Sequence, residues 1–199
     1  MKRFSFTTTL MLLGFGAQPA HAQLISNGGF ETGVLSPWVT TIPCAAAGAV
    51  NVFNAPSGIA HSGSFGLRIS SPTTCSAVQS VATTSGLTYT LSFWLANTLG
   101  SSTNQFTAYV GQGIATVSFG NALPFAYALQ TTDFIATSAS TLIRFDGQNS
   151  NSDAAWYVDD VSVVLRSNMT PEPTSIILMA LGLFAVAGAR FVRREVRSF

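Results

Sequence analysis

A stretch of strict alternation, Leu87–Leu95, constrains the fold of this chain more than any other feature. Every second position is apolar, and these positions point one way: Leu87, Tyr89, Leu91, Phe93 and Leu95. The positions between them, which include Trp94, point the other way. A period of two over this length is typical of a β-strand with one buried face. The stretch therefore predicts a sheet that is covered on one side only.

Shorter segments with β-branched and aromatic residues repeat this signal, and no helical period of useful length accompanies them. Phe106–Val110 and Ala115–Phe119 read as a strand pair around the turn Gly111–Gly113. We expect further strands at Gly66–Ser70, Ala77–Val81, Leu142–Phe145 and Trp156–Leu165, with a turn at Ser71-Pro72 and a polar loop at Asp146–Asp153. Many short strands separated by turn signals predict an all-β fold, a β-sandwich of one domain.

The first 22 residues differ from this body. Lys2 and Arg3 precede an uncharged stretch with a short apolar core, and the stretch ends in small residues at Ala20 and Ala22. This order is typical of a secretory signal peptide cleaved after Ala22, and the apolar core is too short to span a bilayer. The alternative is a buried N-terminal helix.

The last 32 residues also stand apart. A Pro-containing linker, 168–175, precedes an apolar segment at 176–192 and a basic tail at 193–199. The apolar segment lies near the lower length limit for a membrane-spanning helix. Its flanking arginines should stay in the cytoplasm, which places the body, 23–167, outside. The alternative is an amphipathic helix packed on the domain.

The body is mildly acidic once the two ends are set apart. Between Gln23 and Thr170 there are three arginines, six acidic residues and no lysine, for a net charge of −3. A surface without basic patches argues against binding to nucleic acid or to anionic lipid. The two cysteines, Cys44 and Cys75, both fall in this exported body, where an oxidising compartment favours a disulfide between them.

The C-terminal region resembles the PEP-CTERM sorting signal of Gram-negative bacteria. Pro171-Glu172-Pro173, an apolar segment and an arginine cluster with Arg190, Arg193 and Arg194 follow one another close to the end. The resemblance implies that an exosortase, a membrane protease, removes this tail during export. It also implies an association with exopolysaccharide and the biofilm matrix.

The body resembles a jelly-roll β-sandwich of the carbohydrate-binding-module and galactose-binding-like type. Four blocks in the family's order carry this resemblance: Asn27–Glu31 followed by Trp38, His61–Arg68, Tyr89–Trp94 and Val158–Val163. In such folds a structural calcium ion links the first and last strands. Carried over by motif, the ligands would be the carbonyls of Gly29 and Ser64 and the carboxylates of Glu31 and Asp159, with Asp160 as a substitute. The alternative is that these carboxylates are solvated charges at strand ends.

Candidate sugar-binding residues follow from the same reading, because a sugar site needs aromatic platforms and polar groups in a concave surface. Trp94 lies on the face opposite the apolar positions of its strand. The other candidates are Asn97, Gln105, Tyr109, Tyr127 and Arg144. For each aromatic residue the alternative is packing in the core.

A catalytic site is hard to assemble from the body. His61 is its only histidine, and lysine is absent, which removes lysine-based nucleophiles. We therefore expect no enzyme activity, and an exported surface or matrix protein that associates with exopolysaccharide. The alternatives are a structural or protein-interaction module and a polysaccharide hydrolase that would use loop carboxylates.

Overall fold

The computed structural model describes residues 22–41, 44, 48–54, 60–99, 104–111, 113–150, 154–166, 179 and 181–183. By contacts within the chain it divides into two compact units, Met1–Leu165 and Arg166–Phe199. All strands lie in the first unit, and every residue of the main hydrophobic core lies between Ile25 and Val163. The second unit shows helical residues at 179 and 181–183.

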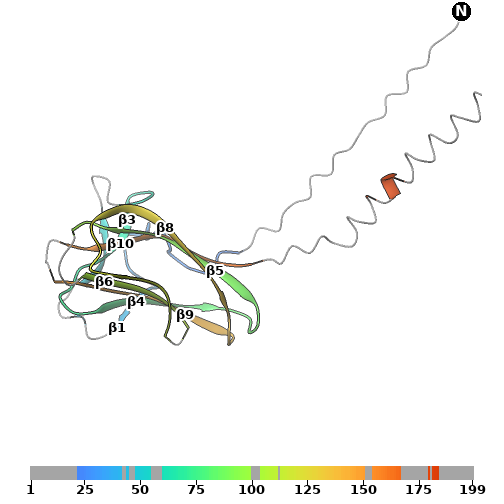
Figure 1. The fold of residues 1–199 in the computed structure, drawn as a ribbon, viewed down its shortest axis with the longest axis horizontal. Coiled ribbons are helices and arrows are strands. Elements are labelled where there is room, and N and C mark those ends of the chain that lie inside the picture. Colours follow the sequence, from blue (N-terminus) through green and yellow to red (C-terminus); the bar gives the residue numbers. More distant parts are fainter. Residues whose placement is uncertain are drawn as a thin grey trace, which may run out of the picture. The chain divides into compact units, whose positions relative to one another are not determined.

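The first unit is a sandwich of two five-stranded antiparallel sheets (Figure 1). Its strands are β1 (Val39–Thr41), β2 (Val50–Asn54), β3 (Phe65–Ile69), β4 (Cys75–Ala82), β5 (Thr88–Asn97), β6 (Asn104–Val110), β7 (Ile114–Gly120), β8 (Phe125–Ile135), β9 (Ser140–Asn149) and β10 (Trp156–Leu165). Sheet A has the order β1-β4-β9-β6-β7, and sheet B has the order β2-β3-β10-β5-β8. The predicted all-β sandwich is confirmed.

The alternation that predicted a half-buried strand is realised in β5. Leu91, Phe93 and Leu95 are fully buried between the sheets, while Trp94 on the other face is half-buried. One position of the pattern differs: Leu87 precedes the strand and is 42% exposed. The apolar alternation therefore begins one residue before β5, at a position that does not contribute to the core.

Two other expectations need correction. The predicted polar loop Asp146–Asp153 begins too early, because β9 continues as paired strand through Asn149 opposite β4 and β6. The 11-residue strand β8 was not predicted at all. Both segments mix polar and apolar residues, because each strand has one face towards solvent. Their sequences therefore resemble loops more than buried strands do.

Aromatic residues from both sheets fill the space between the layers. The Trp156 ring lies 5.4 Å from the Phe106 ring and 6.1 Å from the Phe119 and Phe125 rings, measured between centroids. A second tryptophan, Trp38, lies 5.7 Å from Phe145 in the same way. Both tryptophans pack in the core, with Trp38 2% exposed and Trp156 fully buried.

The predicted disulfide between Cys44 and Cys75 is present, with the two Cα atoms 4.9 Å apart. Cys75 is the first residue of β4, and Cys44 lies in the connection from β1 in sheet A to β2 in sheet B. The bond therefore attaches this crossover connection to the edge region of sheet A.

Several predicted segments fall outside the described residues. These are the signal peptide apart from Ala22, the linker and motif Pro171-Glu172-Pro173, the basic tail with its arginines, and most of the apolar segment 176–192. Within the part of the chain that the structure describes, no helix has the length and apolar character needed to cross a membrane.

Candidate functional site

The last strand, β10, carries a β-bulge that brings two carboxylates to one place. The pairing of β10 with β5 shifts register between Asp159 and Ser162, and Asp160 adopts a left-handed φ of 48°. A bulge redirects side chains, and aspartate tolerates the left-handed region better than most residues do. As a result Asp159 and Asp160, which are neighbours in sequence, both face the segment 60–65.

Backbone and side-chain donors of this segment hold the two carboxylates. The N–H groups of His61 and Ser62 donate to Asp159 Oδ2 at 2.8 and 3.2 Å. The Ser62 hydroxyl donates to Asp160 Oδ1 at 2.7 Å, and His61 Nδ1 lies 2.7 Å from Asp160 Oδ2. The segment therefore wraps around the start of the bulge.

A third carboxylate reaches the same segment from the N-terminal end of the domain. Glu31 accepts hydrogen bonds from the backbone N–H groups of Ser64 at 2.9 Å and Phe65 at 2.8 Å. Gly63, with a φ of 63°, packs its backbone against the Glu31 carboxylate so closely that a Cβ there would collide with it. Only glycine suits this position, both for its φ and for its contact.

The five residues predicted as calcium ligands are brought together in the structure. A Cβ placed on Gly29 would lie 3.6 Å from Asp160 Oδ1, 3.9 Å from Asp159 Oδ1 and 3.8 Å from Glu31 Cγ. Carboxylate and carbonyl oxygens are the donors that calcium prefers, so the chemistry of this set fits the ion. Among the described residues, no group of three or more His, Cys, Asp or Glu side chains is arranged to hold a metal ion, so the three carboxylates by themselves do not form such a site.

The electrostatics of this cluster also favour a cation. Asp159 is completely buried, and burial raises the pKa of its carboxyl to about 6 against the opposing effect of hydrogen bonds from Ser62, Asp160 and His61. Asp160 beside it also raises this pKa. A buried carboxylate next to a second one is costly to ionise, and a bound cation would remove that cost.

We expect the stability of the calcium-free protein to fall as pH rises from about 4 to about 6. The folded state holds the Asp159 proton more tightly than the unfolded chain, so the contribution is complete below pH 4 and is lost through the folded pKa of about 6. Thermal melts in chelator should show this loss, and Asp159→Asn should reduce it. Calcium at pH 7 should raise the melting temperature of the wild type but not of Asp159→Asn; an unchanged wild-type melt would contradict a calcium site.

The predicted sugar-binding residue Trp94 lies directly beside this cluster on the outer face of sheet B. The His61 ring stacks on the Trp94 ring with centroids 3.8 Å apart and an angle of 14° between planes. The Tyr127 ring meets His61 edge-on at 5.4 Å. Burial and the neighbouring Asp159 raise the pKa of the Tyr127 hydroxyl, which therefore stays protonated as a hydrogen-bond donor.

A hollow of about 390 Å³ opens next to this aromatic group, at the end of β5 and the start of β8. Tyr157 and Tyr127 stand on either side of the small residue Ala96, with which they form a separate apolar cluster. Arg68 is the register partner of Tyr157 on the neighbouring strand β3. The lining residues are Ala96, Asn97, Thr98, Pro124, Phe125, Ala126, Tyr127 and Tyr157.

Asn97 forms part of the wall of this hollow and is 1% exposed. Its Nδ2 donates to the carbonyl oxygens of Ala122 at 3.2 Å and Leu123 at 3.4 Å, which ties the connection before β8 to β5. Its other amide atom, Oδ1, is buried and has no hydrogen-bond partner in the part of the chain that the structure describes.

The other three predicted sugar-binding residues lie on sheet A, away from this hollow. Arg144 on β9 stacks over the Tyr109 ring on β6 at 4.0 Å and contacts Asp146 Oδ1 through Nε at 3.0 Å. Gln105, also on β6, is exposed. The six predicted residues are thus divided between the two sheets, because β5 and β8 belong to sheet B whereas β6 and β9 belong to sheet A.

Two members of the sheet B group were missed from the sequence. Tyr157 precedes Asp159 by two residues, so the period of a strand places both on one face. His61 was considered only as a catalytic residue, although it lies in the block that carried the family resemblance. The two-residue period of β10 could have identified Tyr157 from the sequence. The stacking of His61 on Trp94 could not be predicted in this way, because it depends on how segment 60–64 packs in the folded domain.

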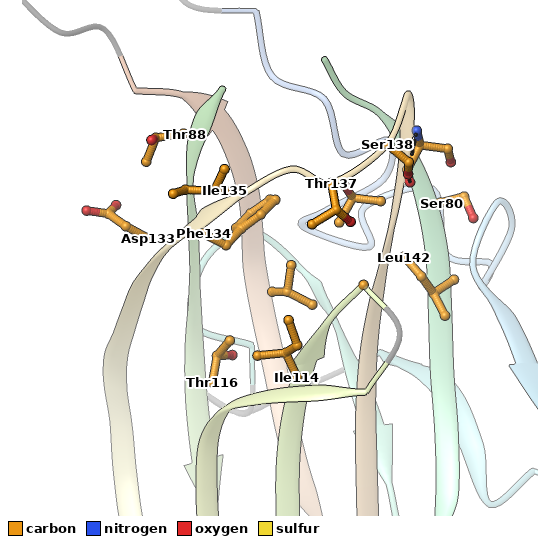
Figure 2. Close-up of a pocket in the computed structure, with 14 residues that line it drawn as sticks. Ser80, Thr88, Ile114, Thr116, Asp133, Phe134, Ile135, Thr137, Ser138 and Leu142 are labelled. Atoms are coloured by element: carbon orange, nitrogen blue, oxygen red, sulfur yellow. Dashed lines mark hydrogen bonds between the residues drawn. The ribbon is translucent and has the colours of Figure 1, made fainter. Parts of the chain in front are cut away.

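A larger hollow of about 930 Å³ lies at the opposite ends of β5 and β8 (Figure 2). Aliphatic side chains such as Ile114, Ile135 and Leu142 line it together with threonine and serine hydroxyls, as the close-up shows. Phe134 is the sole aromatic residue among its described lining residues. With one aromatic residue in its lining, this hollow offers fewer platforms for a sugar ring than the hollow that Phe125, Tyr127 and Tyr157 line.

Comparison with known families places a sorting signal at the C-terminus. Residues 170–194 match the model of the PEP-CTERM protein-sorting motif. The chain is therefore an exported protein that passes the membrane to the cell surface. No curated protein sequence matches the chain significantly.

Solved structures with the same fold are mostly carbohydrate-binding modules. The chain is similar to the CBM61 domain TmCBM61, solved in complex with β-1,4-galactotriose, with 21% identity, a TM-score of 0.55 and coverage of 73% of this chain and 99% of that one. It is also similar to the CBM22-1 xylan-binding domain of Xyn10C from Paenibacillus barcinonensis, with 18% identity, a TM-score of 0.51 and coverage of 75% and 97%. An arabinose-bound α-L-arabinofuranosidase, MgGH51, matches over 27% of its own length, with 14% identity, a TM-score of 0.55 and coverage of 75% of this chain. These likenesses define the fold as a jelly roll of the carbohydrate-binding-module type, found both in binding modules and in parts of enzymes.

Proposed function

We propose that this chain is an exported, non-enzymatic surface or matrix protein whose sandwich binds a glycan of the extracellular polysaccharide. The observation that carries the proposal is the hollow of about 390 Å³ that Tyr127 and Tyr157 line together with Ala96, the small residue against which both tyrosines pack. Two aromatic rings separated by a small residue form a slot of the kind that accepts the apolar face of a sugar ring.

The polar groups around the slot suit a neutral sugar. The Tyr127 hydroxyl remains protonated, and the Asn97 side chain forms part of the wall. Between Gln23 and Thr170 the body carries a net charge of −3 and no lysine, so its surface would repel an acidic polysaccharide. The proposed ligand is therefore an uncharged hexose or pentose chain.

The acidic cluster would support the slot rather than contact the sugar. Calcium held by Glu31, Asp159, Asp160 and the carbonyls of Gly29 and Ser64 would hold segment 60–65 in place, and with it His61 on Trp94. We propose this role for the ion on the grounds of the donor chemistry and of the burial of Asp159. The ion supplies no chemistry to a reaction here.

The sorting motif suggests how the protein reaches its ligand. We propose that an exosortase-type protease cleaves near the motif at 170–194 while segment 176–192 is held in the inner membrane, and that the sandwich is then released or attached outside. The rival function is a structural or protein-interaction module for which the sandwich is only a stable scaffold.

One experiment in the native host tests the proposal. The wild-type protein should be recovered with the extracellular polysaccharide, with an intact mass that lacks the basic tail. Tyr127→Ala should weaken its retention on immobilised polysaccharide about tenfold, which corresponds to about 1.4 kcal/mol, because half of the aromatic slot is lost. Calorimetric titration of both proteins with neutral oligosaccharides measures the same difference in affinity.

The matched control is Tyr109→Ala, which removes an equally half-buried tyrosine from the outer face of sheet A. Its retention should equal that of the wild type. If Tyr109→Ala loses retention and Tyr127→Ala does not, the sugar site lies on sheet A beside Arg144. If neither changes retention, the scaffold function is favoured.

A further inference from the structure

Strand β8 differs from the other strands that end a sheet. It is 11 residues long and pairs only with β5, at the edge of sheet B. The remaining edge strands that the structure describes are short or interrupted: β1 has three residues, β2 has five, and β7 has seven with a register shift opposite Ala108 and Tyr109. Short or bulged edges are the usual protection against edge-to-edge association, and β8 has neither feature over its main length.

Every second residue of β8 points its backbone N–H and C=O groups away from β5, towards the open edge of sheet B. Ala136 donates its N–H to the Leu87 carbonyl at 2.9 Å and accepts from the Gly86 N–H at 2.8 Å, so both of its backbone groups face β5. In an antiparallel ladder this direction alternates along the strand. Leu129, Thr131 and Ile135 therefore point their N–H and C=O groups towards the open edge.

The sequence of β8 lacks the residues that usually prevent an edge strand from pairing with another chain. The strand, Phe125–Ile135, contains no lysine, arginine or proline, and its pairing with β5 runs without a bulge from Thr88–Ile135 to Leu95–Ala128. Its one charged side chain, Asp133, accepts a hydrogen bond from the Thr90 hydroxyl at 2.6 Å. Leu129 and Ile135 are 54% and 65% exposed. Lysine, proline and bulges are the devices that block such edges in other proteins.

We propose that β8 pairs antiparallel with β8 of a second copy of this chain, so that two five-stranded sheets join into one sheet across a two-fold axis. The row of outward N–H and C=O groups requires an extended strand as its partner, and a two-fold pair allows one surface to serve as both halves of the interface. The bulge-free part of β8, Ala128–Ile135, supplies eight residues, or roughly 27 Å of paired edge.

Charge placement selects the register of this pair and is compatible with a second copy on the two-fold axis. With Thr131 on the two-fold axis, Asp133 lies opposite Leu129 of the second copy, so the two carboxylates do not face each other. A pair centred on Asp133 would place like charges directly opposite, which is unfavourable. The centre at Thr131 also coincides with the middle of the bulge-free part of the strand.

Disulfide trapping in the mature protein, isolated from its native host, tests the contact. In a hydrogen-bonded antiparallel pair the two Cα atoms lie about 5.5 Å apart, within the range that a disulfide spans. Cys44 and Cys75 are the only cysteines in the chain and are bonded to each other. Oxidation of Thr131→Cys should therefore give a linked dimer on a non-reducing gel, whereas Ser118→Cys on the edge strand β7 should stay monomeric. Equal dimer yields from the two variants would overturn the proposal.

A charge-exchange experiment tests the register independently. Thr131→Lys and Thr131→Glu should each reduce co-precipitation of two differently tagged copies several-fold, because like charges then meet on the axis. Mixing the lysine variant with the glutamate variant should restore co-precipitation to the wild-type level. Because Thr131 is exposed, the melting temperature should change little in either variant. Wild-type co-precipitation in both single variants, or no recovery in the mixture, would contradict the proposed pairing.

Discussion

Trp156→Ala is expected to lower the free energy of unfolding by about 3–5 kcal/mol. The indole is fully buried at the start of β10, between Phe106 of sheet A and Phe125 of sheet B. Its Nε1 also donates a hydrogen bond to the Gln148 carbonyl at 3.1 Å. The substitution therefore opens a cavity between the layers and leaves a buried acceptor without its donor.

Urea unfolding followed by tryptophan fluorescence and circular dichroism measures this loss. Trp94→Ala is the matched control, because it removes the same side chain from the half-buried outer face of sheet B. The control should lose distinctly less stability than Trp156→Ala. Equal losses of unfolding free energy in the two variants would mean that burial between the sheets does not make Trp156 more stabilising than Trp94.

Removal of the disulfide with Cys44→Ala and Cys75→Ala together should lower the free energy of unfolding by about 3–4 kcal/mol. The bond closes a loop with a sequence separation of 31 residues, and its loss restores that loop's freedom to the unfolded chain. The loop also contains the crossover from sheet A to sheet B, so the loss should affect β1 and β2 first.

The same denaturation experiment with reductant provides the control. Reductant should shift the wild-type midpoint to that of the double variant and leave the double variant unchanged. A double variant as stable as the oxidised wild type would show that the short edge strands hold the crossover without the covalent bond.

Strand β8 shows why part of the fold was not predictable from the sequence. Its inward positions include Gln130 and Thr132, because a strand at the edge of a sheet covers little of the core. The apolar period that identifies a strand is therefore weak in the one strand that is longest. Only its ladder with β5, formed by residues about forty positions away, makes it a strand.

The candidate site shows the same division between local and distant information. The carboxylates of Glu31, Asp159 and Asp160 could be identified from the sequence, because each belongs to a short motif of neighbouring residues. Their meeting at Gly29 joins segments about 130 residues apart, and the contact of segment 60–65 with Asp159, which places His61 on Trp94, joins segments 98 residues apart. The candidate sugar residues were grouped wrongly in space, since a sequence period tells the face of a strand but not the sheet to which the strand belongs.

By itself, the sequence determined the all-β class, the buried face of β5, the disulfide and the sorting motif. Each of these is written in neighbouring residues, as an alternation, as a pair of cysteines in an exported chain or as a three-part signal. The tertiary structure alone decided the order of strands in the two sheets, the slot between Tyr127 and Tyr157, and the open edge of β8. These features arise from contacts between distant segments, whose pairing is selected by the packing of the whole core and not by any local pattern.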